Sequence, residues 1–273
     1  LKAKELFELS DKTAIVTGGM GQLGIIYSNV LVDAGAKVAI FDRSKKPIIN
    51  NSVFESNLEK EKIQAFDVDI TSKKSILSCL EKVVDKCGIP HILINNAALD
   101  SPPNSPPEEN GPFETYPESS YDKVMEVNVK GTLLCCQAVG ALMAEEGRGS
   151  IINISSMYGN LSPRQDIYDF RRKKGEVFFK PVAYSVSKSA ILNLTRYLAT
   201  YWAKSGVRVN TMSLHGVFNN QPKEFLEAYC PHVPMGRMAK AEEMAGTIIY
   251  LASEASSYVT GSNLVIDGGW SAW

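Results

Sequence analysis

The sequence has little that would point to a disulfide framework or a metal site. Its five cysteines form an odd set without C-x-x-C spacing, and its three histidines are scattered: Cys79, Cys87, Cys135, Cys136, Cys230, His91, His215 and His232. A disulfide scaffold needs paired cysteines, and a zinc site needs clustered Cys and His ligands. We therefore expect reduced thiols, no bound metal and a cytoplasmic protein.

An excess of charge of one sign and a long apolar run are also missing. The formal net charge is −1, which favours neither nucleic acid nor an anionic membrane as a partner. No apolar run is expected to reach the ~18–20 residues that span a bilayer. The first residues, LKAKELFELSDK, are too charged for a signal peptide. We expect a soluble protein without membrane or nucleic-acid partners.

What the chain does have is length and a regular alternation of patterns. Its 273 residues, 44% of them hydrophobic, can form one large α/β domain or two small ones. Strands are predicted at 13–17, 37–42, 63–67, 91–95, 151–155, 207–213 and 263–267. Helices are predicted at 24–35, 72–88, 119–146, 183–204 and 241–254. This alternation predicts one doubly wound parallel sheet with helices on both faces, and without a linker residues 1–273 form a single domain.

Two stretches interrupt the alternation. Residues 99–118 are rich in proline and acidic residues, and residues 163–181 mix a basic cluster with aromatics. Both are predicted to be loops. Two interpretations stay open: they are solvated surface loops, or they cover a substrate, because loops at the carboxyl ends of parallel strands surround the ligand crevice.

The fragment TGGMGQLG (17–24) is a glycine-rich turn between a predicted strand and a helix. Gly19, Gly21 and Gly24 spell G-x-G-x-x-G, whereas Gly18 and Gly24 frame G-x-x-x-G-x-G with Gln22 at the middle glycine position. Free N–H groups and the positive end of a helix dipole suit a pyrophosphate. The turn alone indicates a nucleotide site without specifying the nucleotide.

Asp42 ends the second predicted strand. A carboxylate there can accept hydrogen bonds from an adenosine ribose and repels a 2′-phosphate, which favours NAD over NADP. The adjacent Arg43 tempers this preference, since an arginine can bind a 2′-phosphate. A turn-capping role is the structural alternative for Asp42.

Tyr184 and Lys188 are four residues apart on a predicted helix, so the phenol and the ammonium share one face. A nearby cation favours the phenolate and brings the tyrosine towards acid/base chemistry. Such a pair alone is usually an exposed helix pair. Its significance depends on the motifs that accompany it.

Those motifs occur in order along the chain: TGGMGQLG (17–24), FD (41–42), DV (67–68), NNAA (95–98), NVKG (128–131), INISS (152–156), YSVSK (184–188), RVN (208–210) and the stretch from GRMAKAEEMAG to VIDGG. With them the sequence resembles the short-chain dehydrogenase/reductase family almost from end to end. The resemblance implies a single-domain Rossmann fold and NAD(P)-dependent hydride transfer between a secondary alcohol and a ketone.

The resemblance also implies residue roles. Tyr184 would be the acid/base, Ser156 would bind the substrate oxygen, Lys188 would bind the nicotinamide ribose and tune Tyr184, and Asn128 would hold a proton-relay water. Asp67 and Val68 would flank the adenine, and Val217 would reach the carboxamide through its backbone. The implied cofactor-binding residues are Gly18, Met20, Gly21, Gln22, Leu23, Asp42, Arg43, Asp67, Val68, Asn95, Ala97, Tyr184, Lys188, Leu214 and Val217.

The family pattern selects one register for the glycine turn, and it also selects one of two adjacent serines. It puts Gly18, Gln22 and Gly24 at the three glycine positions, so Gln22 is a departure and Gly21 supplies flexibility one residue earlier. It selects Ser156 over Ser155, because adjacent strand residues face opposite sides. Ser156 and Tyr184 are separated by about twice the usual spacing, which marks 163–181 as an insertion.

Other departures affect the substrate side. Ala98 replaces the usual glycine, and Leu214 and His215 stand where proline and glycine are common. His215 therefore has two open interpretations, a substrate contact or a tolerated loop residue.

The loop form and the GGWSAW ending are similar to those of dehydrogenases of bacterial surface-sugar and flagellin-glycan pathways. This similarity implies a sugar-like substrate. One alternative within it is a phosphorylated or nucleotide-linked sugar. Basic residues of the insertion would meet such an anion: Arg164, Arg171, Arg172, Lys173 and Lys174. The alternatives are a reductase of an acyl or sugar-acid substrate and a non-catalytic NAD-binding scaffold.

The family resemblance further implies a homodimer or homotetramer formed through the helices at 119–146 and 183–204 and the final strand. Trp270 and Trp273 are costly to leave in water. They are expected either at an intersubunit surface or active site, or packed on the same subunit.

Overall fold

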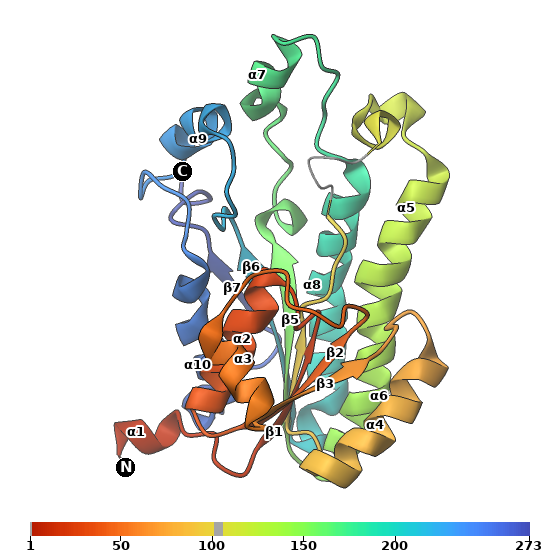
Figure 1. Cartoon of the computed structure of the whole chain (residues 1–273), viewed down its shortest axis with the longest axis vertical. Coiled ribbons are helices and arrows are strands. Elements are labelled where there is room, and N and C mark those ends of the chain that lie inside the picture. Colours follow the sequence, from red (N-terminus) through yellow and green to blue (C-terminus); the bar gives the residue numbers. More distant parts are fainter. Residues whose placement is uncertain (1, 101–105) are drawn as a thin grey trace.

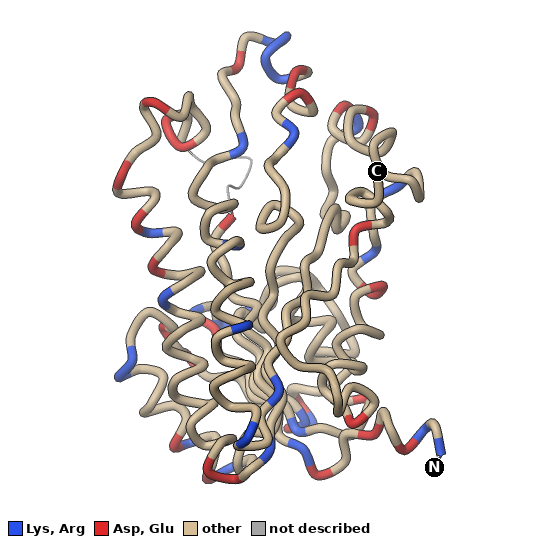
Figure 2. The backbone as a smooth tube through the Cα atoms, turned by 180° about the vertical axis from the view of Figure 1, so that it is seen from behind, with Lys and Arg blue, Asp and Glu red and all other residues tan. Residues whose placement is uncertain are grey.

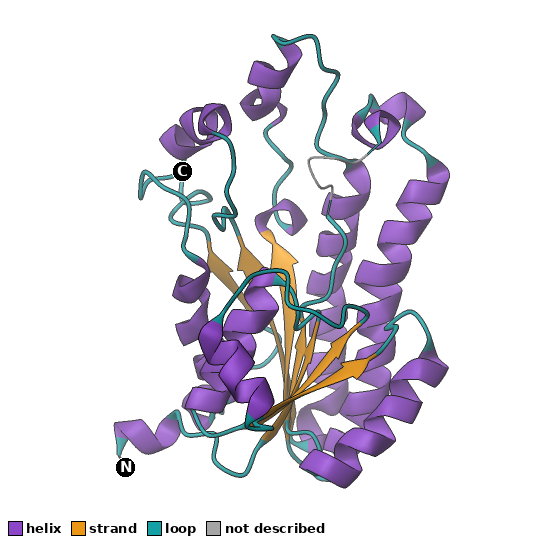
Figure 3. Ribbon diagram, in the orientation of Figure 1, coloured by secondary structure: helices purple, strands orange, loops and turns teal. Residues whose placement is uncertain are grey.

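A computed structural model describes residues 2–100 and 106–273; Leu1 and residues 101–105 of the predicted 99–118 loop lie outside the described residues. In this part of the chain seven strands form one parallel sheet in the order β3-β2-β1-β4-β5-β6-β7 (Figures 1 and 3). The strands are β1 (Thr13–Thr17), β2 (Lys37–Asp42), β3 (Ile63–Asp67), β4 (Ile92–Asn95), β5 (Gly149–Ser156), β6 (Val207–Leu214) and β7 (Asn263–Ile266). The predicted doubly wound sheet is confirmed.

The order of the strands reverses between β1 and β4. From β1 the chain builds outward through β2 to β3, and from β4 it builds in the other direction to β7. Ligands of open α/β sheets bind outside the carboxyl ends of the strands at such a switch point. The end of β1 is Thr17, directly before the glycine turn, so the topology puts this turn at the crevice.

Helices cover both faces of the sheet. Figure 3 shows the sheet between two helical layers, and contacts assign α2, α3 and α10 to one layer and α4, α6 and α8 to the other. The helices are α1 (Ala3–Leu6), α2 (Gln22–Asp33), α3 (Ser52–Glu59), α4 (Lys73–Cys87), α5 (Glu118–Met125), α6 (Thr132–Glu145), α7 (Asp169–Arg172), α8 (Val182–Trp202), α9 (Lys223–Tyr229) and α10 (Ala245–Ala252).

Short helical turns fill several connections. They are η1 (Pro107–Asn110), η2 (Phe113–Thr115), η4 (Met157–Gly159), η5 (Gln165–Tyr168), η6 (Ala203–Ser205), η7 (Cys230–His232), η8 (Ala241–Met244) and η9 (Glu254–Ser256). A π-helical turn, η3 (Glu126–Gly131), joins α5 to α6.

The core lies on both faces of the sheet because strand residues alternate between them. Ala14 and Val16 of β1 pack on the α2 and α10 side, whereas Ile15 packs on the α4 and α6 side. All five residues of β1 are buried. This is the expected pattern of a central parallel strand with helices above and below.

The segment Glu118–Glu145, which runs through α5, η3 and α6, is long and apolar enough to cross a membrane by length and composition alone. The sequence analysis did not anticipate this. Half of its apolar window is buried in the protein, because α6 packs against α4, β4 and β5. Such burial is usual for a core helix.

The helices α1, α3 and α9 and the structure inside the insertion were not predicted. α3 buries only Phe54, and α9 buries only Tyr229, so neither shows a strong apolar stripe. The insertion, residues 163–181, contains η5 and α7 and projects above the sheet beside α9 (Figure 1).

Candidate active site

The predicted site residues converge on the carboxyl end of the sheet. A cavity of about 880 Å³ opens there and is lined by segments that follow β1, β4, β5 and β6, by the start of α8 and by the insertion. Ser156, Tyr184 and Lys188 all line this cavity. Gln22, Leu23, Leu214 and Val217 line it as well, so predicted residues that are far apart in the sequence are brought to one place.

The glycine turn is built by close packing that side chains would prevent. Gly18 has a positive φ of 63°, and a Cβ on it would lie 2.8 Å from the Ala97 Cα. A Cβ on Gly24 would lie 2.3 Å from the Gly18 carbonyl oxygen. Gly21 is the N-cap of α2 and provides no side-chain cap. The first N–H groups of this 12-residue helix therefore face the crevice, an arrangement that fits a pyrophosphate.

Gln22, the departure from the family pattern, is directed across the crevice. Its Nε2 donates to the Phe218 carbonyl at 2.8 Å. The side chain thus links the glycine turn to the segment after β6. Leu23 and Gln22 both line the cavity.

Asp42 holds the glycine turn from β2. Its Oδ2 accepts from the Met20 N–H at 2.9 Å and its Oδ1 from the Ser44 N–H at 2.8 Å. Each carboxylate oxygen keeps a second lone pair for a ribose hydroxyl. Arg43 is exposed and lies near Asp69, whose pKa is lowered mainly by hydrogen bonds from Thr71 and slightly by Arg43.

The predicted cofactor residues at the ends of β3 and β4 differ in burial. Val68 is buried and Asp67 is exposed. The Asn95 side chain is directed into the core, where its Nδ2 donates to Asn153 Oδ1 at 2.8 Å. Contact of Asn95 with a cofactor would therefore come from its backbone, and this role stays a prediction.

Asn96 is a functional residue that the sequence analysis missed. Its Nδ2 donates to the carbonyls of Thr17 and Gly18 at 3.1 and 3.0 Å, and it lines the cavity. The Ala97 N–H donates to Thr17 Oγ1 at 3.0 Å. Asn96 and Ala97 therefore fix the glycine turn from the β4 side; the second asparagine of NNAA was the only available signal.

Tyr184 and Lys188 share one face of α8, as their spacing predicts. Lys188 Nζ lies 5.7 Å from the centre of the Tyr184 ring and donates to the Ile154 carbonyl at 2.9 Å. Lys188 is only 4% exposed, and this burial lowers its pKa to about 8. The charged form is therefore readily lost in mildly alkaline solution.

Two opposing effects act on the pKa of Tyr184. Burial raises the pKa of its phenol, and the negative charge of Asp100 and the Tyr158 hydroxyl add to this effect. A hydrogen bond from Ser156 acts in the opposite direction and stabilises the phenolate. The Ser156 hydroxyl therefore lies near the Tyr184 phenol, close enough to affect its pKa.

The two adjacent serines have different partners. Ser155 Oγ donates to the Lys188 carbonyl at 2.8 Å and so ties β5 to α8. Ser156 Oγ accepts from the Tyr158 N–H at 3.2 Å and lies near the Tyr184 phenol. This division follows the alternation of strand side chains and supports Ser156 as the substrate-binding serine.

Asn128 lies in the π-helical turn η3 and is buried. Its side chain binds the main chain of Leu99 and the Ser187 hydroxyl, and its carbonyl accepts from Thr132 Oγ1 at 2.8 Å. π-Helical turns often mark functional sites. A proton-relay water on Asn128 stays a prediction.

At the end of β6, Leu214 and the following His215 are buried. Val217 forms a bridge with Ala239, in which the flanking Gly216 carbonyl and Phe218 N–H make the hydrogen bonds. The Val217 N–H therefore points to the other side, and contact with a carboxamide stays a prediction.

His215 lies in an aromatic cluster. Its ring is 4.4 Å from the Trp270 ring and 5.3 Å from those of Tyr158 and Tyr229. Burial lowers its pKa to about 4, so it is neutral at physiological pH. Trp270 packs on the same subunit, whereas Trp273 is 82% exposed.

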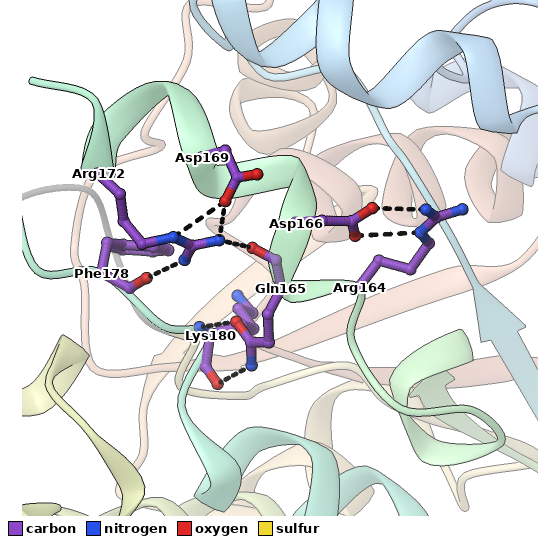
Figure 4. A network of polar contacts seen from close by, with 7 residues as sticks. All are labelled: Arg164, Gln165, Asp166, Asp169, Arg172, Phe178 and Lys180. Atoms are coloured by element: carbon purple, nitrogen blue, oxygen red, sulfur yellow. Dashed lines mark hydrogen bonds and ion pairs between the residues drawn. The ribbon is translucent and has the colours of Figure 1, made fainter.

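The insertion is held together by a polar network, drawn in Figure 4. Arg172 donates to the carbonyls of Phe178 and Gln165 and is paired with Asp169, so it joins the two arms of the insertion. The Gln165 side-chain amide donates to the Lys180 carbonyl and accepts from the Lys180 N–H. Apolar packing of Ile167, Tyr168 and Phe178 against α9 and Trp270 completes the structure.

Most basic residues of the insertion have acidic partners close by. Arg164 pairs with Asp166, Arg171 with Glu176, Lys174 with Glu224 and Lys180 with Asp100; with the Arg172 pair, these account for five of the six basic residues. Figure 2 shows the resulting mixture of basic and acidic segments in the projecting insertion. Arg171 and Lys174 line the cavity, but their charges are already balanced.

Comparison with known proteins places this geometry in a family. A family model described as enoyl-(acyl carrier protein) reductase matches residues 23–271. A solved short chain dehydrogenase from Leptospira borgpetersenii with bound NAD⁺ is 32% identical, with a TM-score of 0.84 over 99% of this chain and 96% of that one. The chain belongs to the short-chain dehydrogenase/reductase family.

Curated relatives of this short-chain dehydrogenase/reductase act on polyols and sugar acids. The ribulose-forming D-arabinitol 2-dehydrogenase of Scheffersomyces stipitis is 33% identical over 98% of this chain and 96% of that protein. The gluconate 5-dehydrogenase of Gluconobacter oxydans is 30% identical over 97% and 96%. The chain is accordingly an oxidoreductase that interconverts an alcohol and a ketone with a nicotinamide coenzyme.

The comparisons leave the choice of coenzyme open. NAD⁺ is bound in the Leptospira structure, and NADP is bound in a gluconate 5-dehydrogenase from Burkholderia cenocepacia, which at 24% identity and a TM-score of 0.84 over 100% of both chains shares the fold. In this chain the uncapped start of α2, the tight glycine turn and the Asp42 carboxylate fit a dinucleotide.

Proposed function

We propose that this enzyme uses NAD to oxidise one secondary hydroxyl of an open-chain sugar alcohol or sugar acid, and that it catalyses the reverse reduction. The proposal rests on Ser156, Tyr184 and Lys188, which meet in the same cavity at the carboxyl end of the sheet. A hydride carrier bound on the glycine turn would supply the acceptor for the hydride.

The side chains have separate tasks in this reaction. The Tyr184 phenolate accepts the substrate hydroxyl proton during oxidation and returns it during reduction, a form of acid/base help worth ~10²–10⁴-fold. Ser156, close to Tyr184, holds the same substrate oxygen. Lys188 on the same helix face supplies positive charge beside the ring.

NAD is preferred in this proposal because of Asp42. Its carboxylate lies at the end of β2 beside the glycine turn, where it would bind ribose hydroxyls and repel a 2′-phosphate. Arg43 is exposed and its charge contributes slightly to the lowered pKa of Asp69; no hydrogen bond directs it towards the glycine turn in the described residues. The roles predicted for the other cofactor-binding residues are unchanged in this proposal.

The cavity lining combines apolar side chains with hydrogen-bonding ones, and the latter suit a polyhydroxylated substrate. Asn219, Asn220 and Gln221 are among the hydrogen-bonding residues, as are Tyr158, Tyr168 and Tyr229. The similar D-arabinitol 2-dehydrogenase and gluconate 5-dehydrogenase act on arabinitol and gluconate. We therefore favour a polyol or sugar acid over the surface-sugar or nucleotide-linked substrate that the loop and tail motifs suggest.

Two other functions remain as competitors. The matched family model carries the description of an acyl carrier protein reductase, which suggests an enoyl or acyl substrate. A non-catalytic scaffold would bind the coenzyme without turnover, but it has no use for the proximity of Ser156 to Tyr184.

We further propose a cytoplasmic homodimer or homotetramer. All five cysteines are free thiols, which suits a reducing compartment. Tyr197 and Tyr201 of α8 are stacked on each other and 63% and 66% exposed. Exposed aromatics on a helix predicted to join subunits support an interface there.

The test is coenzyme reduction with a panel of polyols, aldonates, nucleotide sugars and acyl thioesters, each with NAD and NADP. We expect turnover of a polyol or aldonate with NAD. Tyr184→Phe should lose at least about 10³-fold in kcat while it still binds NAD. Full activity of Tyr184→Phe, or NAD binding without turnover of any substrate, would contradict the proposal.

A further inference from the structure

A second lysine lies beside the acid/base tyrosine. Lys180 Nζ is 5.0 Å from the centre of the Tyr184 ring, closer than Lys188 Nζ at 5.7 Å. Lys180 lines the same cavity, and its side chain is only 10% exposed. An ammonium near a ring face is attracted by the electrons of the ring, and more strongly where water is excluded.

Lys180 is carried to this place by the insertion rather than by α8. The helix begins at Val182, so the spacing of four residues between Lys180 and Tyr184 is not a helical one. The Gln165 amide fixes the Lys180 backbone through two hydrogen bonds, of 3.2 and 2.9 Å (Figure 4). The neighbouring Phe179 N–H donates to the Asn110 carbonyl at 2.8 Å.

Asp100, which follows β4, provides the counter-charge. It forms an ion pair with Lys180 although the two residues are 80 positions apart. Its own side chain is 55% exposed, so the acid is the solvated member of the pair and the lysine is the sheltered one. A pair built only for surface stability would expose both side chains.

Four ionisable groups therefore surround Tyr184. Lys188 comes from α8, Lys180 from the insertion, Asp100 from the segment after β4, and Tyr158 from η4. The negative charge of Asp100 raises the pKa of Tyr184. A cation at the ring has the opposite effect, because it stabilises the phenolate.

We propose that Lys180 is a second positioning lysine for the acid/base reaction, delivered by the insertion to the face of Tyr184 and restrained there by Asp100. The inference rests on the proposed function of Tyr184. Lys180 stabilises the phenolate, and Asp100 limits this stabilisation. The insertion thus has a chemical task in addition to covering the cavity.

The experiment compares pH profiles of kcat/KM for alcohol oxidation, in which the phenolate is the active form. For Lys180→Met the acid limb should move to higher pH by about one unit, a tenfold loss of kcat/KM below the apparent pKa. For Asp100→Asn the limb should move to lower pH by a similar amount. Opposite shifts from two members of one ion pair cannot come from the loss of the pair as a structural contact.

Lys173→Met is the matched control, because Lys173 is an exposed lysine of the same insertion; its profile should match that of the wild type. Circular dichroism and NAD binding show whether each variant is folded. Shifts in the same direction for both variants, or no shift, would overturn the inference. So would an increase in KM for Lys180→Met with an unchanged pH profile, because Lys180 would then contact the substrate. If the wild type turns over no alcohol, the proposed function fails instead.

Discussion

The side-chain amide of Asn128 and the main chain of Leu99 form a two-way hydrogen-bonded pair. Asn128 Oδ1 accepts from the Leu99 N–H at 2.7 Å, and Asn128 Nδ2 donates to the Leu99 carbonyl at 3.0 Å. The same Nδ2 reaches Ser187 Oγ on α8. One buried asparagine thus holds the segment that carries Asp100 in register with the helix that carries Tyr184.

Asn128→Ala should therefore lower the free energy of unfolding by about 3 kcal/mol, because it leaves the N–H and carbonyl of Leu99 without their partner. Urea denaturation measures the change. Ser187→Ala removes one of the three bonds, together with the bond from Ser187 Oγ to the Tyr184 carbonyl, and should cost about 1–2 kcal/mol. Equal losses for both variants would show that the pair with Leu99 is not the source of the stability.

Gly24→Ala should weaken coenzyme binding. Its new Cβ would lie 2.3 Å from the Gly18 carbonyl oxygen, so the glycine turn must move, at a cost of ~1–3 kcal/mol. We expect at least a tenfold increase in the Kd for NAD, measured by fluorescence titration. Gly246→Ala in α10 is the control, since a Cβ there meets nothing within 4 Å and alanine should stabilise the helix by ~0.5–1 kcal/mol.

Lys188 should make stability depend on pH. Burial lowers its pKa from the usual 10.5 to about 8, so between these values the unfolded chain holds the proton and the folded chain does not. The free energy of unfolding of the wild type should therefore rise from pH 8 to 10.5 by about 3 kcal/mol relative to Lys188→Met. Below pH 8 Lys188 is protonated in the folded and the unfolded chain, so the folded state bears the full free-energy cost of burying the charge. Parallel stability curves for the two proteins would contradict the shift.

Asp42→Ser should reduce the preference for NAD. The change removes the charge that repels a 2′-phosphate and also one hydrogen bond to the Met20 N–H. We expect a tenfold or larger increase in KM for NAD and a smaller change for NADP, from initial rates with both coenzymes. An unchanged ratio of the two KM values would remove Asp42 from coenzyme selection.

Arg172→Met should loosen the insertion, since Arg172 joins its two arms through Phe178 and Gln165. Hydrogen exchange of the amides in 165–180 should become about tenfold faster, and the KM for substrate should rise while the KM for NAD stays constant. Lys173→Met, next in the chain and exposed, should change neither. Unaltered exchange in Arg172→Met would show that the apolar packing holds the insertion by itself.

The sheet was predictable because its central strands are continuous buried runs between glycines and helical patterns. β1 has the bounds of the predicted strand, and β5 and β6 extend theirs by one to three residues. α3 and α9 were not predicted, because each buries a single side chain and a short helix held by tertiary contacts leaves little periodic signal.

The site was predictable where the spacing of residues within one helix or one strand determines which side chains share a face. The face shared by Tyr184 and Lys188 follows from helix periodicity, and the different partners of Ser155 and Ser156 follow from strand alternation. The pair between Lys180 and Asp100 was not predictable, because 80 residues separate its members. The basic cluster was predicted to meet an anionic substrate; its local acidic partners were visible in the sequence, but their pairing was not.

Trp270 has a practical consequence for work with this enzyme. It stacks on Tyr229 at 5.0 Å and lies against His215, and both of these residues line the cavity, so this residue after β7 supports the cavity wall. The C-terminal end lies near α9, whereas α1 lies at the opposite end of the molecule (Figure 1). An affinity tag for purification therefore belongs before α1, far from the wall that the kinetic measurements examine.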